Sequence, residues 1–240
     1  MSNYYHFKTI DSTSTYLKNN YKQYGNLTFV SADFQTEGHG RNNRKWISAK
    51  KENLLFSILI KDREIIDKYS SLSLYSAACV YEVLSRLNIN DISIKWPNDV
   101  FVGDKKIAGI LLEGISFSGN IEALVIGVGI NVNSIKFDKD MKNTPTSILL
   151  ETNKETDLED LKKIIYDSFK LMINNIKEYD SYYLNIVRNN NYLKDKEVSV
   201  DINNHKEIVK VIDINEDNSL KVKKGNEYFN LYSGEVIINK

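Results

Sequence analysis

The order of apolar segments along the chain constrains its fold more than any single motif. Helical periodicity over residues 11–24, 65–88 and 157–188 is interleaved with apolar runs that are typical of strands. These expected strands are 27–34, 53–60, 92–96, 99–102, 106–115 and 121–130. After Asn190 the pattern changes to five short alternating runs separated by Asn, Asp and Gly turns, namely 198–200, 208–214, 220–223, 227–231 and 235–238. We therefore expect a main domain of helices and strands with a small barrel or sandwich appended to it.

Composition limits the classes of function that the chain can have. Its 240 residues are 42% hydrophobic and 11% aromatic, which supports a proper core. The 32 basic and 32 acidic residues cancel, so we expect no overall attraction to nucleic acid or to an anionic membrane. No apolar run approaches the ~20 residues of a membrane span, and the first residues lack a secretory pattern. The single cysteine, Cys79, cannot form an internal disulfide and is expected to be a buried, inert thiol. These features favour the cytoplasm.

The segment from Gln35 to Lys51 is a long polar connection between two expected strands. Within it, Gly38 and Gly40 allow close approach of the backbone to a ligand. Its cations, at positions 41, 44 and 45, suit phosphate oxygens, and Asn43 is the residue expected to tolerate a left-handed conformation. A flexible basic surface loop is the alternative. The spacing fits neither the Walker phosphate loop nor the dinucleotide-binding fingerprint.

Two further segments carry polar groups in unusual settings. Lys95-Trp96-Pro97-Asn98-Asp99 groups a cation, an indole, an amide and a carboxylate, and Lys105-Lys106 follows directly. A site for a charged substrate and a surface ion pair around a core tryptophan both remain open for this cluster. The third segment, Gly127-Val128-Gly129-Ile130-Asn131-Val132-Asn133, ends a buried strand in glycines and amides. Taken alone, it is typical of an ordinary strand end.

Together with Asp11-Ser12-Thr13, these segments resemble the biotin–protein ligases, also called biotin–[acetyl-CoA-carboxylase] ligases, over nearly the whole chain. The most specific elements are Lys-Trp-Pro-Asn-Asp and Gly-x-Gly-Arg-x-x-Arg-x-Trp. The resemblance implies an α/β (α+β) fold in which a mixed sheet is backed by helices, similar to class II aminoacyl-tRNA synthetases. It also implies that residues 1–190 form the catalytic domain and residues 191–240 an SH3-like barrel.

The resemblance also implies roles for individual residues. Biotin would contact Ser12, Thr13, Ser14, Gln35, Gly38, His39, Lys106 and Gly109. ATP and the adenylate would contact Arg41, Arg44, Trp46, Asn98, Lys106 and Asn131. Arg41 and Lys106 would be the electrostatic catalysts, and Asp99 would orient the acceptor amine or bind a metal.

The activity implied by the resemblance is ATP-dependent attachment of biotin to a lysine of a biotin carboxyl carrier domain. Biotin would first form biotinyl-5′-AMP, with Mg²⁺ entering mainly on the ATP phosphates. Such chemistry depends on positioning and preorganised charge, which agrees with the absence of a convincing Ser-His-Asp or Cys-His arrangement. We expect residues 36–46 to be mobile without ligand and to close over the adenylate.

Two residues depart from the family pattern, and more than one function remains open. His39 replaces the commoner arginine, and Ser14 replaces the commoner asparagine. We expect no N-terminal winged helix and no nucleic-acid or membrane partner, while a homodimer remains open. Lipoate–protein or octanoate–protein ligase is the nearest rival activity. A non-catalytic biotin-binding or nucleotide-binding regulator, and a barrel interaction module on an inert domain, also remain open.

Overall fold

The main sheet has seven strands in the order β1-β2-β3-β7-β6-β5-β4. The computed structural model describes residues 3–138, 143–202, 205–232 and 236–238. The strands of this sheet are β1 (Tyr4–Phe7), β2 (Thr28–Ala32), β3 (Asn53–Ile60), β4 (Ile92–Lys95), β5 (Asp99–Val102), β6 (Lys105–Phe117) and β7 (Asn120–Asn131). Only β1 and β2 pair in parallel, and the other pairs are antiparallel, so the expected mixed sheet is confirmed. Strand β1 was not expected from the sequence.

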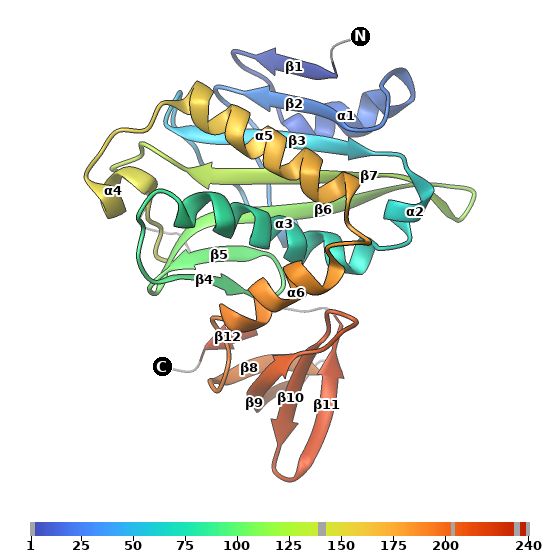
Figure 1. Ribbon diagram of the computed structural model, residues 1–240, viewed down its shortest axis with the longest axis vertical. Helices are drawn as coiled ribbons and strands as arrows, with labels where there is room; N and C mark the ends of the chain where they lie inside the picture. The colour runs from blue at the N-terminus through green and yellow to red at the C-terminus, as the bar shows by residue number, and fades with distance from the viewer. Residues whose placement is uncertain (1–2, 139–142, 203–204, 233–235, 239–240) are drawn as a thin grey trace.

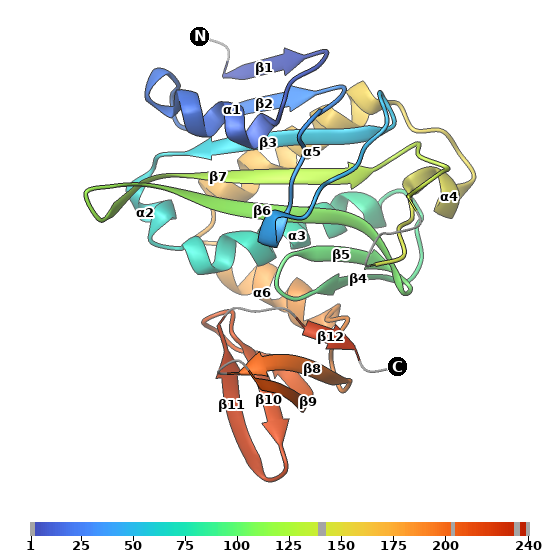
Figure 2. The same cartoon turned by 180° about the vertical axis from the view of Figure 1, so that it is seen from behind.

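The two faces of this sheet are covered differently (Figures 1 and 2). One face carries α3 (Tyr69–Ser85), α5 (Leu158–Asn174) and α6 (Asp180–Asn189). The other face carries α1 (Thr13–Asn20) and the connection between β2 and β3, which contains the 3-10 turn η2 (Arg41–Asn43). The remaining helical elements are η1 (Tyr21–Gln23), α2 (Arg63–Ile66) and α4 (Ile148–Thr152). The second face is therefore the one left open for a site.

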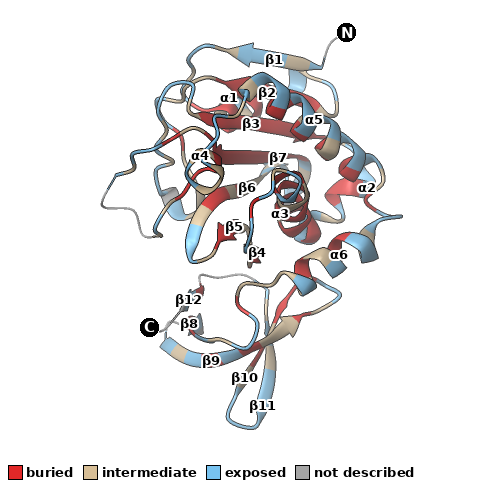
Figure 3. Cartoon of the chain, turned by 60° about the vertical axis from the view of Figure 1, so that its left-hand side comes forward, coloured by how far each residue is buried: buried red, intermediate tan, exposed pale blue. Residues whose placement is uncertain are grey.

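The core is concentrated in the central strands and in α3, as Figure 3 shows. Every residue of β3 is buried, because α5 covers one face of the strand and α1 the other. Helix α3 buries residues on more than one side, since it packs against β6 as well as against α5 and α6. Leu87 lies beyond the end of the helix and is only partly buried. Cys79 is buried as expected, and burial raises the pKa of its thiol.

Polar residues interrupt two of the expected helices. The segment 65–88 is divided into α2 and α3, and Asp62 caps the first of them through the N–H groups of Glu64 and Ile65. The segment 157–188 is divided into α5 and α6. Asn175 ends α5, where its side-chain amide donates to Leu171 O at 2.9 Å and so satisfies a carbonyl of the last turn.

The C-terminal segment forms a five-stranded antiparallel sheet in the order β11-β10-β9-β8-β12. Its strands are β8 (Glu197–Ile202), β9 (His205–Ile214), β10 (Leu220–Lys224), β11 (Glu227–Leu231) and β12 (Val236–Ile238), which confirms the five expected short strands. Glu235, the expected first residue of the last strand, lies outside the described residues. Trp96 Nε1 donates to Asn218 O at 3.0 Å, and Asn218 Nδ2 donates to Ser71 Oγ at 2.8 Å. The buried Trp96 side chain therefore links the main sheet to the C-terminal sheet by a hydrogen bond.

No helix in the described ranges is both long enough and apolar enough to cross a membrane.

Candidate active site

A cavity of about 990 Å³ opens on the sheet face that carries α1 and the β2–β3 connection. The strand register places Leu55, Gly129, Gly109, Asp99 and Lys95 opposite one another on β3, β7, β6, β5 and β4. Directly paired residues in neighbouring strands point to the same face of a sheet. These five residues therefore form a straight row, here called the floor row, that crosses five strands beneath the cavity.

The two glycines of the floor row let the Trp46 indole lie flat against the sheet. A Cβ atom on Gly129 would lie 2.4 Å from Trp46 Cε2, and one on Gly109 would lie 3.0 Å from Trp46 Cζ3. Real side chains do not approach so closely, so glycine is required at position 129 while the indole is in place. Trp46 Nε1 is buried with no hydrogen-bond partner among the described residues. The indole thus occupies part of the cavity, and the predicted contact of Trp46 with adenine stays a prediction.

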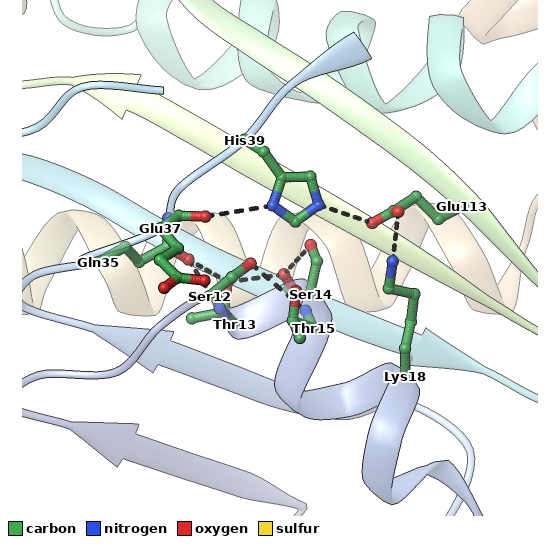
Figure 4. A network of polar contacts seen from close by, with 10 residues as sticks. Ser12, Thr13, Ser14, Thr15, Lys18, Gln35, Glu37, His39 and Glu113 are labelled. Atoms are coloured by element: carbon green, nitrogen blue, oxygen red, sulfur yellow. Dashed lines mark hydrogen bonds and ion pairs between the residues drawn. The ribbon is translucent and has the colours of Figure 1, made fainter. Parts of the chain in front are cut away.

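One end of the cavity is lined by hydroxyl and amide groups from α1 and the β2–β3 connection. Figure 4 shows the polar network that these side chains form. Gln35 Oε1 accepts from the backbone N of Thr13 at 2.7 Å and from its Oγ1 at 2.9 Å. Ser57 Oγ lies 2.8 Å from Thr13 Oγ1 and 2.9 Å from Ser14 Oγ, at the N-terminus of α1. The sequence motifs did not point to Ser57, although it is a polar residue in the apolar run Asn53–Ile60.

The Ser12 side chain caps α1, where its Oγ accepts from Thr15 N at 3.3 Å. Its own backbone N donates to Asp11 Oδ1 at 2.6 Å. The Asp-Ser-Thr motif therefore fixes where the helix begins, and it places the first-turn hydroxyl groups beside the cavity.

Two cations from distant segments converge over β5 and β6. Lys106 Nζ lies 2.7 Å from Asp99 Oδ1, and Arg41 Nη1 donates to Asn98 Oδ1 at 3.3 Å. Asn98 Nδ2 in turn donates to Ile110 O at 2.6 Å, which fixes its amide. Burial lowers the pKa of Arg41, and the charge of Asp99 opposes that shift, but a guanidinium remains charged at neutral pH. Adjacent residues 98 and 99 thus hold the two cations next to each other.

The segment from Gly38 to Trp46 folds back on itself as a tight hairpin. Trp46 N donates to Gly38 O at 2.8 Å, and Gly40 N donates to Arg44 O at 2.7 Å. The left-handed residue in this turn is Asn42, at φ +56°. The sequence marked Asn43 as tolerant of this conformation, and the neighbouring Asn42 is the residue that adopts it.

The His39 side chain ties this hairpin to the rest of the site (Figure 4). His39 Nε2 lies 3.5 Å from Glu113 Oε2 on β6, and Lys18 Nζ on α1 lies 2.5 Å from Glu113 Oε1. His39 Nδ1 is 3.3 Å from Glu37 O. The hairpin, the sheet and the first helix thus meet at one carboxylate.

Asn131, at the end of β7, uses its side chain within the protein. Its Oδ1 accepts from Asn53 Nδ2 at 3.0 Å, and its Nδ2 donates to Thr146 O at 2.9 Å. The residue is 4% exposed. This amide joins β7 to β3 and to the segment before α4, and its direct contact with a nucleotide stays a prediction.

A family model described as the biotin/lipoate A/B protein ligase family matches residues 6–131, which is more than half of the chain. The chain belongs to this family. The matched range includes the α1 motif, the hairpin, the Lys-Trp-Pro-Asn-Asp segment and the glycines of β7.

Individual relatives agree with membership of the biotin/lipoate ligase family. The bifunctional ligase/repressor BirA of Salmonella typhimurium is 34% identical over 158 residues, which are 65% of this chain and 49% of that protein. A biotin–[acetyl-CoA-carboxylase] ligase of Paracoccus denitrificans is 27% identical over 59% of this chain and 60% of that protein. The chain thus spans about half the length of these relatives.

Solved structures of family members have the same fold over the whole chain. The biotin protein ligase from Aquifex aeolicus, in complex with biotin and ATP, superposes with a TM-score of 0.82 at 25% identity and covers 100% of both chains. The biotin protein ligase from Leishmania major, in complex with biotin, has a TM-score of 0.66 at 20% identity. The expected biotin-ligase fold is therefore confirmed.

Nearly all of the residues that the family resemblance implied lie around this one cavity. The cavity is lined by Ser12, Thr13, Ser14, Gln35, His39, Arg41, Arg44, Trp46, Asn98, Asp99, Lys106, Gly109 and Asn131. Gly38 lies instead in a second hollow, which Gln35 and Trp46 also line. Its carbonyl accepts the backbone hydrogen bond from Trp46 N. No local pattern pointed to Tyr192 and Lys196, which also line the cavity. Within the described ranges, no three His, Cys, Asp or Glu side chains are grouped so as to hold a metal ion.

Proposed function

We propose that this chain is a biotin–[biotin carboxyl-carrier protein] ligase, which activates biotin with ATP and transfers it to a lysine of a carrier domain. The observation that carries the proposal is that one cavity combines a hydroxyl and amide end with converging cations. The hydroxyl and amide end suits an uncharged polar ring, and the converging cations suit a carboxylate that meets a phosphate. Family membership and the likeness to biotin- and ATP-bound relatives support the same activity.

The polar end of the cavity favours biotin over lipoate or octanoate. Thr13, Ser14 and Gln35 present hydrogen-bonding groups there, and the buried Ser57 holds the two hydroxyl groups of α1 from behind. The ureido ring of biotin has donors and acceptors for the three lining residues. A dithiolane ring or an alkyl chain offers no hydrogen-bonding groups to this polar end of the cavity. The alternative of a lipoate or octanoate ligase is therefore disfavoured.

In the first step, a biotin carboxylate oxygen attacks the α-phosphorus of ATP, and the bond to the β-phosphate oxygen breaks. Pyrophosphate leaves with that electron pair, and biotinyl-5′-AMP remains. Lys106 and Arg41 offset the repulsion between the two anions and stabilise the charge that develops on the phosphoryl oxygens. Arg44 adds positive charge at the same cavity. The protein mainly positions the reactants, as in other phosphoryl transfers.

In the second step, the acceptor lysine attacks the mixed anhydride as a neutral amine, and AMP leaves. Asp99 would orient that amine, and its position in the floor row beside Lys106 supports this role. The carboxylate is 15% exposed at the side chain, so it is accessible from the cavity. Mg²⁺ would be carried mainly by the ATP phosphates and would neutralise the leaving pyrophosphate, and Asp99 would be its protein ligand.

We infer that residues 1–190 act as the catalytic domain and residues 191–240 as an SH3-like domain. The separate hydrogen-bonding of the two sheets supports this division.

A two-stage labelling experiment tests the proposed function. ATP labelled at the α-phosphate should give a labelled adenylate with biotin, and none with lipoate or octanoate. Labelled biotin should then pass to a purified carboxyl carrier domain. Formation of an adenylate with octanoate alone would replace this proposal with the lipoate-type activity. Binding of biotin without turnover would favour a non-catalytic regulator.

A further inference from the structure

Two ammonium groups share one aromatic ring at the far end of the cavity. Lys196 Nζ lies 3.6 Å from the centre of the Tyr192 ring, and Lys95 Nζ lies 6.0 Å from it and 5.2 Å from the Phe101 ring. The two rings are stacked at 4.8 Å. In the described parts of the chain, neither of these lysines forms an ion pair with a carboxylate, whereas nearby Lys194 pairs with Asp213 at 3.8 Å.

The aromatic platform is held rigidly against the edge of the main sheet. The backbone around Tyr192 pairs with β4, since Tyr192 N donates to Ile94 O at 3.0 Å and Ile94 N donates to Asn190 O at 2.7 Å. The Tyr192 hydroxyl donates to Asp104 Oδ1 at 2.8 Å. Lys196 is fixed by Val211 N, which donates to its carbonyl at 2.9 Å. The chain leading into the C-terminal sheet therefore completes one wall of the cavity.

The floor row gives this cationic pair a defined place relative to the proposed chemistry. The hydroxyl and amide end lies over β3 and β7, Lys106 and Asp99 lie over β6 and β5, and Lys95 lies on β4. Neighbouring strands are about 4.8 Å apart, so the order of the groups is also their order in space. In an in-line displacement, the leaving group departs opposite the attacking oxygen. A carboxylate that attacks from the β3 side therefore expels pyrophosphate toward β4.

We infer that Lys95 and Lys196, supported by the Tyr192 ring, form the subsite for the β- and γ-phosphates of ATP and for the departing pyrophosphate. This inference rests on the proposed adenylation reaction. The bond that breaks is the one between the α-phosphorus and the bridging oxygen, whose electron pair leaves on the pyrophosphate next to the two ammonium groups. Lysine suits this task, because it acts as a point charge on phosphate oxygens.

The charge of the cavity agrees with a compact polyanion as its occupant. Among the residues that the structure describes, six lysine and arginine side chains line it against three aspartates, although the whole chain has a formal net charge of zero. Burial lowers the pKa of Lys95, and the positive charges of Lys106, Lys196 and Arg44 lower it further, while Asp99 opposes them. A bound pyrophosphate relieves that repulsion. An acidic segment of the acceptor protein is the competing occupant, which the following experiment separates.

The test compares full-length Lys196→Ala with the matched control Lys194→Ala by titration calorimetry with Mg²⁺ and inorganic pyrophosphate, ATP or AMP. Loss of a charged hydrogen bond weakens binding by roughly tenfold to a hundredfold. We expect this loss for pyrophosphate and ATP in Lys196→Ala, with affinities for AMP and biotin unchanged. The control should match the original protein, and Lys196→Arg should restore most of the affinity.

Several outcomes would overturn the inference. These are unchanged pyrophosphate affinity in Lys196→Ala, an equal loss of AMP affinity, and a raised KM for the carrier domain alone. The proposed function fails separately, if the original protein forms no adenylate from biotin. If that protein still binds pyrophosphate through Lys196, the subsite stands without the ligase activity.

Discussion

Replacement of Lys106 by alanine is the sharpest test of the proposed electrostatics. Its ammonium lies 2.7 Å from Asp99 Oδ1 and faces the cavity, with its side chain 23% exposed. A unit charge about 4 Å from a phosphoryl oxygen contributes about 4 kcal/mol at an effective dielectric constant of about 20. Because each 1.36 kcal/mol changes a rate tenfold, Lys106→Ala should slow adenylate formation by about a thousandfold.

The neighbouring Lys105 provides a matched control for that variant. It pairs with Glu151 at 3.0 Å and is 49% exposed, away from the floor row. Lys105→Ala should therefore retain adenylation within about twofold, since exposed ion pairs contribute little. Single-turnover formation of the labelled adenylate measures the step directly. A loss of less than tenfold in Lys106→Ala, or equal losses in both variants, would refute the assignment of the charge to the transition state.

Three other outcomes are expected. Ser57→Ala leaves the buried Ser14 hydroxyl without its partner, so denaturant unfolding should show a loss of about 1–3 kcal/mol in the free energy of unfolding. Calorimetry should show that the variant loses more affinity for biotin than for ATP. The exposed control Ser116→Ala should change neither quantity. Trypsin cleavage after Arg41 and Arg44 should slow when biotin and ATP are both present, and equal rates would contradict closure of residues 36–46. Burial, together with the hydrogen bond to Asp104, raises the pKa of Tyr192 to about 12 from 10.0. The protonated phenol therefore stabilises the fold below pH 10, this stability is lost as the pH rises toward 12, and Tyr192→Phe should unfold with a weaker pH dependence in that window.

The sequence predicted what depends on local pattern. The continuous apolar run of β3 lies where the sequence placed a strand. The pattern failed where tertiary packing decides the outcome. Strand β1 is only four residues long and exists because it pairs with β2. The long helical patterns did not reveal their breaks, since both halves of each pattern bury apolar residues.

The candidate site was predictable only in part, for a related reason. Motifs identified Arg41 and Lys106, because their residue types are unusual in a core. They did not identify Tyr192 and Lys196, whose position depends on how the chain after α6 pairs with the edge of β4. Such a pairing leaves no local trace in the residues themselves.

The glycines of β7 and the tryptophan of the hairpin are one structural unit, although they lie about eighty residues apart. The Gly-x-Gly pattern alone was typical of an ordinary strand end. In the structure, a Cβ atom added to Gly129 would lie 2.4 Å from the Trp46 ring, so glycine at this position leaves the room that the indole occupies. Gly109 leaves the same room on β6. The hairpin pairing between Trp46 and Gly38 then sets how low the loop lies over the sheet. A side chain at position 129 would lift the indole and, with it, the hairpin that carries Arg41 and Arg44. The strand glycines therefore control the distance between the cations and the floor row, which is the distance on which the proposed catalysis depends.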